Sequence, residues 1–231
     1  MKKAIIFDSG TLISFSIAGM LGKIKELKDV FDGEFLITED VKKEVIYKPL
    51  TIKRFELEAL RVKRLLDKDV LVMPEKIGIN KSEIDKKTEE IMSIANNTFY
   101  EKNKPIKLID YGEASCLALS RILNEKNIEN IIAVDERTLR MLSEKPENLE
   151  RLLHDKLHTK VNSKKENFKF FKEFKFIRSS ELVYIAFKKG FFDLKDHDTV
   201  LDALLYAVKF NGCSISSEEI NEIKKLARSS K

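Results

Sequence analysis

The stretch IIFDSGTLISF, residues 5–15, decides the fold class of this chain. Apolar residues run up to Asp8, and small polar residues then lead into a new apolar pattern. Residues 4–7 predict a short buried strand, and the apolar spacing over residues 12–27 predicts a helix. An aspartate at the end of a buried strand belongs either to a turn or cap, or to a functional site. The companions of Asp8 elsewhere in the chain must decide between these roles.

Composition bounds the class of protein. The chain has 231 residues and is 43% hydrophobic, which is enough for one sizeable core. Its 43 Lys and Arg against 38 Asp and Glu leave a formal charge of +5, which permits an anionic partner without indicating one. Cys116 and Cys213 form neither a metal-ligand spacing nor a disulfide framework, so we expect a reducing compartment. No apolar run approaches the ~20 residues that cross a bilayer. We therefore predict a cytoplasmic protein without a membrane partner.

Strand and helix patterns alternate along the rest of the chain. Further strands are predicted at residues 35–37, 70–73, 131–135 and 174–177, and helices at residues 39–48, 52–67, 81–101, 111–123, 136–144, 180–189, 196–210 and 216–228. This alternation predicts a parallel sheet flanked by helices, with right-handed crossovers. We expect residues 1–195 to form one domain with an extra helical segment at about 50–105. Residues 196–231 are expected to add a C-terminal helical extension packed on the same domain.

Four acids stand where the predicted fold brings them together. Asp8 and Asp135 each end an apolar strand, so both should project at the same edge of a parallel sheet. Glu44 and Glu113 lie on helices that can reach this edge. Close carboxylates repel one another, and either protonation or a hard cation such as Mg²⁺ or Mn²⁺ relieves the repulsion. Such a pocket predicts metal-assisted hydrolysis of a phosphodiester, with the attacking water activated by the metal.

The two strand-end acids also have a structural interpretation. Asp8 suits a turn or a cap, and Asp135 suits the cap of the helix that starts at Glu136. Taken singly, each of these structural roles is favoured over a functional one.

The two helix acids have structural interpretations as well. Asp110 and Glu113 match a D-x-x-E capping box, and for Asp110 the cap is favoured. Glu44 suits a solvent-facing position paired with Lys48 at helical spacing. Only the joint order of the four acids favours a functional site.

That order occurs in the stretches FDSGTLISF, EDVKKEV, DYGEASCLALS and VDERTLRMLSE. Over most of residues 4–145 it resembles the PIN-domain family of metal-dependent ribonucleases. The resemblance implies a three-layer α/β/α PIN-like fold and an acidic pocket that binds Mg²⁺ or Mn²⁺ and cleaves single-stranded RNA. The catalytic positions it implies are Asp8, Glu44, Glu113 and Asp135, with metal on Asp8, Glu113 and Asp135. Supporting positions are Ser9, Asp110, Glu136 and Arg140.

The chain departs from the compact toxins that share this fold. It carries extra helical material at about residues 50–105 and after residue 195, so an antitoxin partner is not indicated. RNA is the expected partner, and a homo-oligomer is left open.

The opening stretch has a second, minor resemblance. Haloacid-dehalogenase-like phosphatases begin with a strand followed by D-x-D-G-T-L, and here the order is Asp8, Ser9, Gly10, Thr11. The second aspartate of that motif is a general acid and base, whose loss removes a contribution of about 10²–10⁴-fold in rate. A phosphatase is therefore a minor alternative to the ribonuclease.

A non-catalytic RNA-binding or assembly module with the same fold is the main alternative. Residues 156–178 interleave phenylalanines with lysines, a mixture that can stack bases and neutralise phosphates. The candidate RNA-binding residues are Lys164, Lys165, Lys169 and Lys172. The pattern also fits core phenylalanines with lysines between them, which is the favoured interpretation.

Three minor features complete the candidates. His154 and His158 have the spacing of zinc ligands on a helix, but no third ligand has a suitable position. Cys116 is expected to be buried and not nucleophilic. Residues 196–198 form an acidic start to a helix, which the helix dipole favours.

Overall fold

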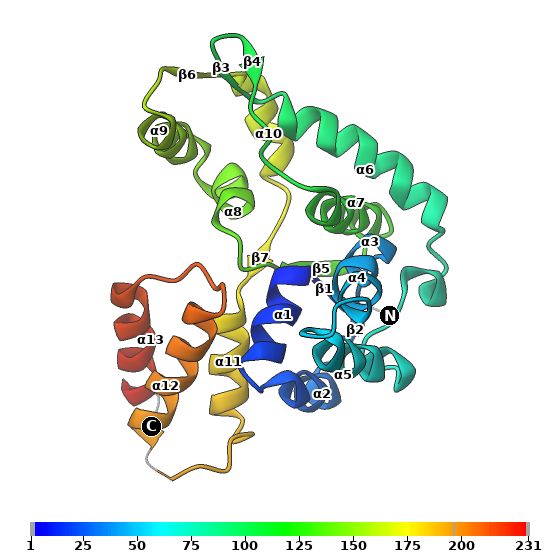
Figure 1. The fold of residues 1–231 in the computed structure, drawn as a ribbon, viewed down its shortest axis with the longest axis vertical. Coiled ribbons are helices and arrows are strands. Elements are labelled where there is room, and N and C mark those ends of the chain that lie inside the picture. The colour runs from blue at the N-terminus through cyan, green and yellow to red at the C-terminus, as the bar shows by residue number, and fades with distance from the viewer. Residues whose placement is uncertain (1–2, 196, 230–231) are drawn as a thin grey trace.

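The protein is an α/β molecule built around a four-stranded parallel sheet (Figure 1). A computed structural model describes residues 3–195 and 197–229. The sheet has the order β2-β1-β5-β7, and its strands are β1 (Lys3–Phe7), β2 (Glu34–Leu36), β5 (Glu129–Ala133) and β7 (Phe176–Ile177). Helices lie on both faces of this sheet. The predicted three-layer α/β/α arrangement, with a parallel sheet and additional helices, is confirmed.

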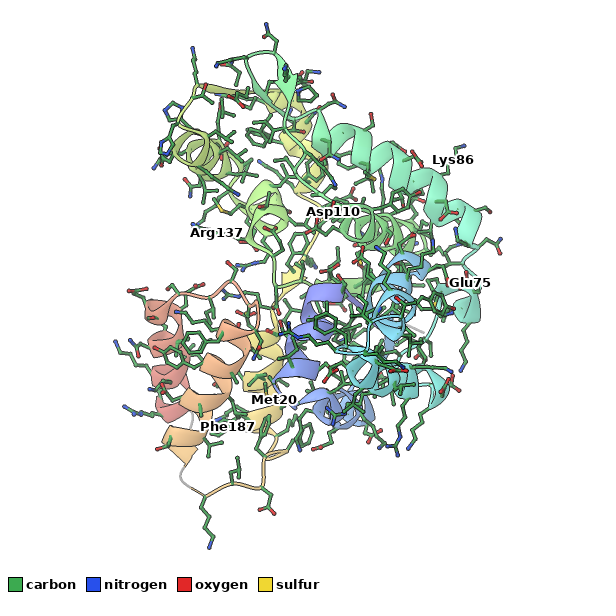
Figure 2. All side chains as sticks on the ribbon, in the orientation of Figure 1. Met20, Glu75, Lys86, Asp110, Arg137 and Phe187 are labelled. Atoms are coloured by element: carbon green, nitrogen blue, oxygen red, sulfur yellow. The ribbon has the colours of Figure 1, made fainter. Side chains whose placement is uncertain are left out.

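One face of the sheet is covered by α1, α2 and α11, and the other mainly by α7. These helices are α1 (Ser9–Ile17), α2 (Leu21–Val30), α7 (Tyr111–Glu125) and α11 (Ser179–Lys188). Met20, between α1 and α2, is buried at this layer (Figure 2). The single helix predicted at residues 12–27 is broken in two at Gly19, whose φ of 71° suits glycine.

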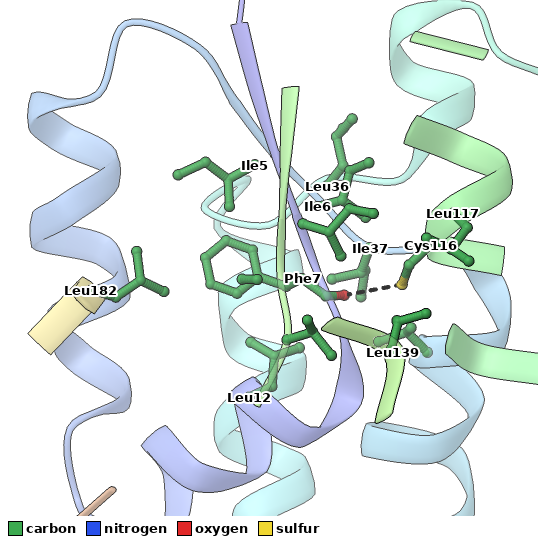
Figure 3. Packing of buried hydrophobic residues seen from close by; sticks show 14 of the residues in the cluster. Ile5, Ile6, Phe7, Leu12, Leu36, Ile37, Cys116, Leu117, Leu139 and Leu182 are labelled. Carbon is green, nitrogen blue, oxygen red and sulfur yellow. Dashed lines mark hydrogen bonds between the residues drawn. The ribbon is translucent and has the colours of Figure 1, made fainter. Parts of the chain in front are cut away.

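Side chains of β1 alternate between the two layers, as the pleat of a strand requires. Ile5 and Phe7 point toward Leu182 of α11, whereas Ile6 points toward Leu117 of α7 (Figure 3). All five side chains are buried. The apolar run that predicted a buried strand is therefore explained by packing on both faces.

The register of the sheet places the ends of β1 and β5 side by side. Phe7 pairs with Ala133, and the Asp8 N–H donates to the Ala133 carbonyl at 3.0 Å. The chain leaves both strands directly after this pair. The two predicted strand-end aspartates therefore emerge at the same edge of the sheet.

The helix predicted to stop before Pro49 continues past it. It consists of α3 (Glu39–Lys42), a π-helical turn η1 (Lys43–Tyr47) and α4 (Lys48–Leu50). Pro49 lies in the first turn of α4, where its missing N–H costs little. Thr38 caps α3 as expected, because its Oγ1 accepts from the Val41 N–H at 3.2 Å.

The strand predicted at residues 70–73 is reduced to a single parallel bridge between Val72 and Leu36. Pro74 follows and begins a 3₁₀ turn, η2 (Pro74–Ile77), which ends the extended segment. Two flanking helices are α5 (Glu56–Asp67) and α6 (Lys81–Asn96). The prediction that the second helix runs to residue 101 is wrong, because a β-hairpin starts at Phe99.

A second lobe lies at the top of Figure 1 and contains a small antiparallel sheet of order β4-β3-β6. Its elements are β3 (Phe99–Glu101), β4 (Lys104–Pro105), α8 (Arg137–Glu144), α9 (Pro146–Leu157), β6 (Val161–Ser163), η3 (Lys165–Asn167) and α10 (Phe168–Phe171). Of these, only the helix over residues 136–144 was predicted. Phe168, Phe171 and Phe174 are buried, so the core interpretation of this phenylalanine-rich segment is confirmed.

Two C-terminal helices, α12 (His197–Phe210) and α13 (Ser217–Ser229), agree with their predicted ranges. The loop between them reaches the carboxyl edge of the parallel sheet, where the Ser14 Oγ donates to the Asn211 carbonyl at 2.9 Å. In the same loop, the Ser214 N–H donates to the Asp135 carbonyl at 3.0 Å. Of the predicted acidic helix start, Asp196 and the side chains of residues 197 and 198 lie outside the described residues. Within the described part of the chain, no helix is long and apolar enough to cross a membrane.

Candidate active site

Asp8 is one of the two almost fully buried candidate acids. It is the N-cap of α1, and its Oδ2 accepts from the Gly10 N–H at 3.1 Å. Its Oδ1 is buried and has no hydrogen-bond partner among the described residues. The pKa of Asp8 is raised to about 6, mainly by burial and also by the charges of Glu44 and Asp135, whereas backbone hydrogen bonds act to lower it. Asp8 therefore caps a helix with one oxygen and leaves the other available.

Asp135 has the same arrangement on the neighbouring strand end. It is 2% exposed, and its Oδ1 accepts at 2.8 Å from the N–H of Ser179, the first residue of α11. Its Oδ2 is buried without a partner in the described structure. The predicted role of Asp135 as a helix cap is wrong, because Glu136 caps α8 by accepting from the Leu139 N–H at 2.9 Å. The side chain of Asp135 instead contacts the first residue of α11, Ser179.

Glu113 reaches the same edge from the first turn of α7. Its Oε2 accepts from the Asp110 N–H at 2.9 Å, so this half of the predicted capping box is present. The pKa of Glu113 is raised to about 8, mainly by burial and also by the charges of Asp8 and Glu136, whereas that backbone hydrogen bond acts to lower it. Asp110 itself is exposed and forms an ion pair with Lys107. Asp110 thus acts as the N-cap of α7, whereas Glu113 belongs to the acidic edge.

Glu44 lies on the π-helical turn η1 and packs against the start of α7. A Cβ atom added at Gly112 would come within 2.9 Å of Glu44 Oε1. The predicted pair between Glu44 and Lys48 is not among the ion pairs of the described residues, so the solvent-facing interpretation of Glu44 is wrong. A π-helical turn is rare and occurs frequently at functional sites. Here it places the Glu44 carboxylate against Gly112, the residue before Glu113.

The buried thiol of Cys116 is close enough to three of the acids for their charges to raise its pKa. Cys116 of α7 is buried, as predicted, and its Sγ donates to the Phe7 carbonyl at 3.9 Å. Burial holds the pKa of Cys116 well above its usual value, and the charges of Asp8, Glu113 and Glu44 raise it further. The same acids also influence Asp8 and Glu113 themselves. The carboxyl edge of the sheet is therefore a region of concentrated negative charge.

The remaining predicted site residues have diverse positions. Ser9 is the first residue of α1, beside Asp8, and is partly buried. Arg140 lies on α8 and pairs with Glu144 at 3.8 Å. The candidate RNA-binding lysines are all exposed on the upper lobe, away from the acidic edge (Figure 1): Lys164, Lys165, Lys169 and Lys172. His154 and His158 are exposed as well.

The acids supply the chemistry of a hard-metal site in an open arrangement. No group of three or more His, Cys, Asp or Glu side chains among the described residues is arranged to hold a metal ion. The donors nevertheless fit Mg²⁺ or Mn²⁺, which take carboxylate oxygens. Asp8 Oδ1 and Asp135 Oδ2 have no competing hydrogen bond, and no cationic side chain lowers the pKa of Asp8 or Glu113. Burial is thus the main influence on the protonation of Asp8 and Glu113.

Two pockets of opposite character flank the acidic edge. A pocket of about 660 Å³ is lined by residues of α8 and of the loop between α12 and α13, including Arg137, Lys209 and Ser214. On the other side, a mainly apolar pocket of about 430 Å³ includes Glu44 and Phe55 in its wall. The first pocket thus has charged and polar side chains in its wall, and the second has mainly apolar ones.

Sequence patterns left three contributors to this site unassigned. Ser179 holds Asp135 through its backbone N–H, and a serine pair at a predicted helix start gives no sign of this contact. Gly112 gives Glu44 room, and its place before Glu113 in the stretch DYGEASCLALS was the available signal. Arg137 directly follows the acids of the last strand but carried no spacing that predicted a pocket. Comparisons with protein-family models, curated proteins and solved structures each returned no match.

Proposed function

We propose that the protein is a divalent-metal-dependent endoribonuclease that hydrolyses phosphodiester bonds in single-stranded RNA, with Mg²⁺ or Mn²⁺ at the acidic edge. The observation that carries the proposal is the pair Asp8 and Asp135. Each is buried at the end of a neighbouring strand, and each keeps one oxygen without a hydrogen bond. An unpaired buried carboxylate oxygen is costly unless a ligand satisfies it. The order of the acids, which resembles that of the PIN-domain family, supports RNA as the substrate.

The side chains of this edge are held in position by the backbone around them. The Gly10 N–H fixes one oxygen of Asp8, and the Ser179 N–H fixes one oxygen of Asp135. The second oxygen of each carboxylate has no partner among the described residues. Glu113 is fixed by the Asp110 N–H. Carboxylates fixed in this way need little reorganisation when a metal ion binds, which favours catalysis. A bound divalent ion would supply an activated water and neutralise charge on the phosphoryl oxygens.

Protonation of the acids should govern when the site can work. With pKa values of about 6 and about 8, Asp8 and Glu113 carry protons through part of the neutral range in the absence of a cation. Ligand binding by a carboxylate requires its ionised form, so metal affinity should rise as the pH increases through these values. Activity at pH 8.5 should therefore exceed activity at pH 6.

The decisive experiment follows cleavage of an end-labelled, unstructured RNA in Mn²⁺ and in EDTA. We expect cleavage only with the metal, and a loss of about 10²-fold or more in Asp8→Asn, a range typical of a group acting at the reacting atoms. The matched control is Asp29→Asn, which removes the same charge from an exposed ion pair with Lys25. Circular dichroism checks that both variants are folded, and calorimetric titration with Mn²⁺ measures metal binding separately.

The same experiment distinguishes the alternatives. Unchanged cleavage in Asp8→Asn would overturn the proposed site. Binding of RNA without cleavage in any divalent metal would favour the non-catalytic module. Turnover of a generic phosphomonoester that depends on Asp8 would favour the phosphatase. Against this alternative, Gly10 occupies the position where the phosphatase motif has its second aspartate.

A further inference from the structure

The pocket on the Asp135 side of the acidic edge is built by two parts of the chain that are distant in sequence. Arg137 and Lys145 come from α8 and the residue that follows it, and Lys209 comes from the end of α12. Ser214 in the loop after α12 joins the pocket to the acids, because its N–H donates to the Asp135 carbonyl at 3.0 Å. The pocket is thus fixed to the candidate catalytic edge by backbone contact.

The positive charges in this pocket are largely free of acidic partners. The two carboxylates of its wall each pair with an arginine of the same wall, Glu219 with Arg178 at 2.7 Å and Glu144 with Arg140 at 3.8 Å. The other cations of the wall are Arg137, Lys145 and Lys209. No carboxylate among the described residues forms an ion pair with Arg137, Lys145 or Lys209, although Lys209 Nζ donates to Ser217 Oγ at 3.0 Å. An unpaired cation in a concave wall favours an anionic ligand.

The positive surface continues beyond the first pocket along the upper lobe. A second pocket of about 610 Å³ shares Arg137, Met141 and Asn148 with the first. From α9 it adds the cations Arg151 and Lys156 and one acid, Asp155. Together the two form a groove, which we call the α8–α9 groove, that runs away from Asp135. A point anion would need only one of these pockets. A row of separated cations suits a chain that carries a phosphate at every unit.

We propose that the α8–α9 groove binds the backbone phosphates of a single RNA strand and leads that strand to the acidic edge. This inference rests on the proposed function, because it takes RNA as the substrate of Asp8 and Asp135. Arg137 stands at the junction of the two pockets and directly after Asp135 and Glu136 in the chain. Its guanidinium has the geometry for paired hydrogen bonds to phosphate oxygens. Because Lys209 lies on α12, this C-terminal helix would also contact the RNA.

Binding is measured without cleavage, using a fluorescent 12-nucleotide oligouridine in EDTA over a range of NaCl concentrations. We expect Arg137→Ala and Lys209→Ala each to weaken binding by about 3- to 10-fold at low salt. Each should also reduce the slope of log K against log salt by about 0.7, as expected for one lost phosphate contact on a single strand. Lys86→Ala is the matched control, since Lys86 is exposed on α6 and Figure 2 labels it on the opposite side of the molecule from Arg137.

Each outcome separates this proposal from the ribonuclease proposal. If Arg137→Ala and Lys209→Ala bind the oligouridine as Lys86→Ala does, the groove is not the RNA path, even if the wild type cleaves RNA. If the expected losses occur but no metal supports cleavage, the groove stands and the ribonuclease proposal fails. A 12-residue polyglutamate that binds as tightly, with the same dependence on Arg137, would assign the groove to an acidic protein and overturn the RNA path. Stronger losses in Lys164→Ala or Lys172→Ala would move RNA binding to the upper lobe.

Discussion

The four acids of the candidate site form two pairs that the fold positions in different ways. Asp8 and Asp135 follow adjacent strands, and the pairing of Phe7 with Ala133 sets their separation. Glu44 and Glu113 come from helices, and their positions depend on a π-helical turn and on the absence of a side chain at Gly112. The strand-end pair is almost fully buried, whereas the helix pair is partly exposed.

This difference shows that the sheet positions two of the acids and that its covering helices position the other two. Sheet register is fixed by many backbone hydrogen bonds, so it sets where Asp8 and Asp135 leave their strands, and one backbone N–H then holds each carboxylate. Helix-borne side chains need local devices, and here one acid uses the Asp110 N–H and the other the space above a glycine. We therefore expect the strand-end pair to carry the larger share of function, and the helix pair to be more sensitive to changes around it.

The largest expected effect separates the two pairs by activity. Asp135→Asn keeps the acceptor for the Ser179 N–H but removes the charge, and RNA cleavage should fall by about 10²–10⁴-fold. Glu44→Gln should lower it by about 10–100-fold, as expected for a residue that supports metal ligands. Single-turnover cleavage rates in Mn²⁺ measure both. Equal losses would show that the two pairs have the same role.

The next effect concerns the pH dependence of the metal-free protein. Asp8 has a folded-state pKa of about 6 against an ordinary 3.8, so its protonated form favours folding. This contribution is fully present below the ordinary pKa and is lost as pH rises through about 6. At about 1.4 kcal/mol per pKa unit, unfolding free energy should fall by roughly 3 kcal/mol between pH 4 and pH 7 from this group.

The Asp8→Asn variant has no group that titrates at this position, so it is the control for the wild type. Urea denaturation of the wild type and of the variant at pH 5 and pH 8 should show a variant that is the more stable protein at pH 8 without metal. Added Mn²⁺ should reverse the order, because it stabilises only a protein that binds it. A variant less stable than the wild type at pH 8 in EDTA would mean that Asp8 is not strained by burial.

A smaller effect is expected from crowding the helix pair. Gly112→Ala places a Cβ about 2.9 Å from Glu44 Oε1, so Glu44 must move, and we expect a loss of about 10-fold in cleavage. Gly22→Ala on α2 is the control, because an added Cβ there meets no atom within 4 Å. The control should keep its activity and gain up to about 1 kcal/mol in stability. Full activity of Gly112→Ala would remove Glu44 from the site.

The smallest effect tests the boundary of the site. Glu136 caps α8, so Glu136→Ala should cost about 1 kcal/mol in thermal or chemical denaturation, whereas Glu136→Gln keeps the acceptor for the Leu139 N–H. We expect cleavage by Glu136→Gln to stay within about threefold of the wild type, because the removed charge lies at the margin of the acids. A loss as large as that of Asp135→Asn would place Glu136 among the principal acids.

Local patterns predicted the parallel sheet and most helices because they depend on neighbours in the chain. The apolar run before Asp8 and the capping residues Thr38 and Asp110 are of this kind. The upper lobe was not predicted, since its strands have two or three residues each and pair only across long sequence separations, such as Phe99 with Ser163. Short strands have too few residues for an alternating pattern to be recognised.

The candidate site divides in the same way. The order of the four acids was readable from the chain, and so was the edge at which two of them would emerge. The metal position that the resemblance implies for Asp135 stays a prediction. The helix cap expected of Asp135 belongs to Glu136 instead, because the two residues are adjacent and only the contact with Ser179 distinguishes them.

The amino-acid sequence by itself determined that acids follow buried strands and that those strands run in parallel, because hydrophobic periodicity and helix caps act over a few residues. Only the tertiary structure decided that Glu44 rests on Gly112 and that Arg137 and Lys209 line one pocket beside Asp135. These contacts join residues tens of positions apart. Their geometry follows from the packing of whole elements, and no local pattern encodes it.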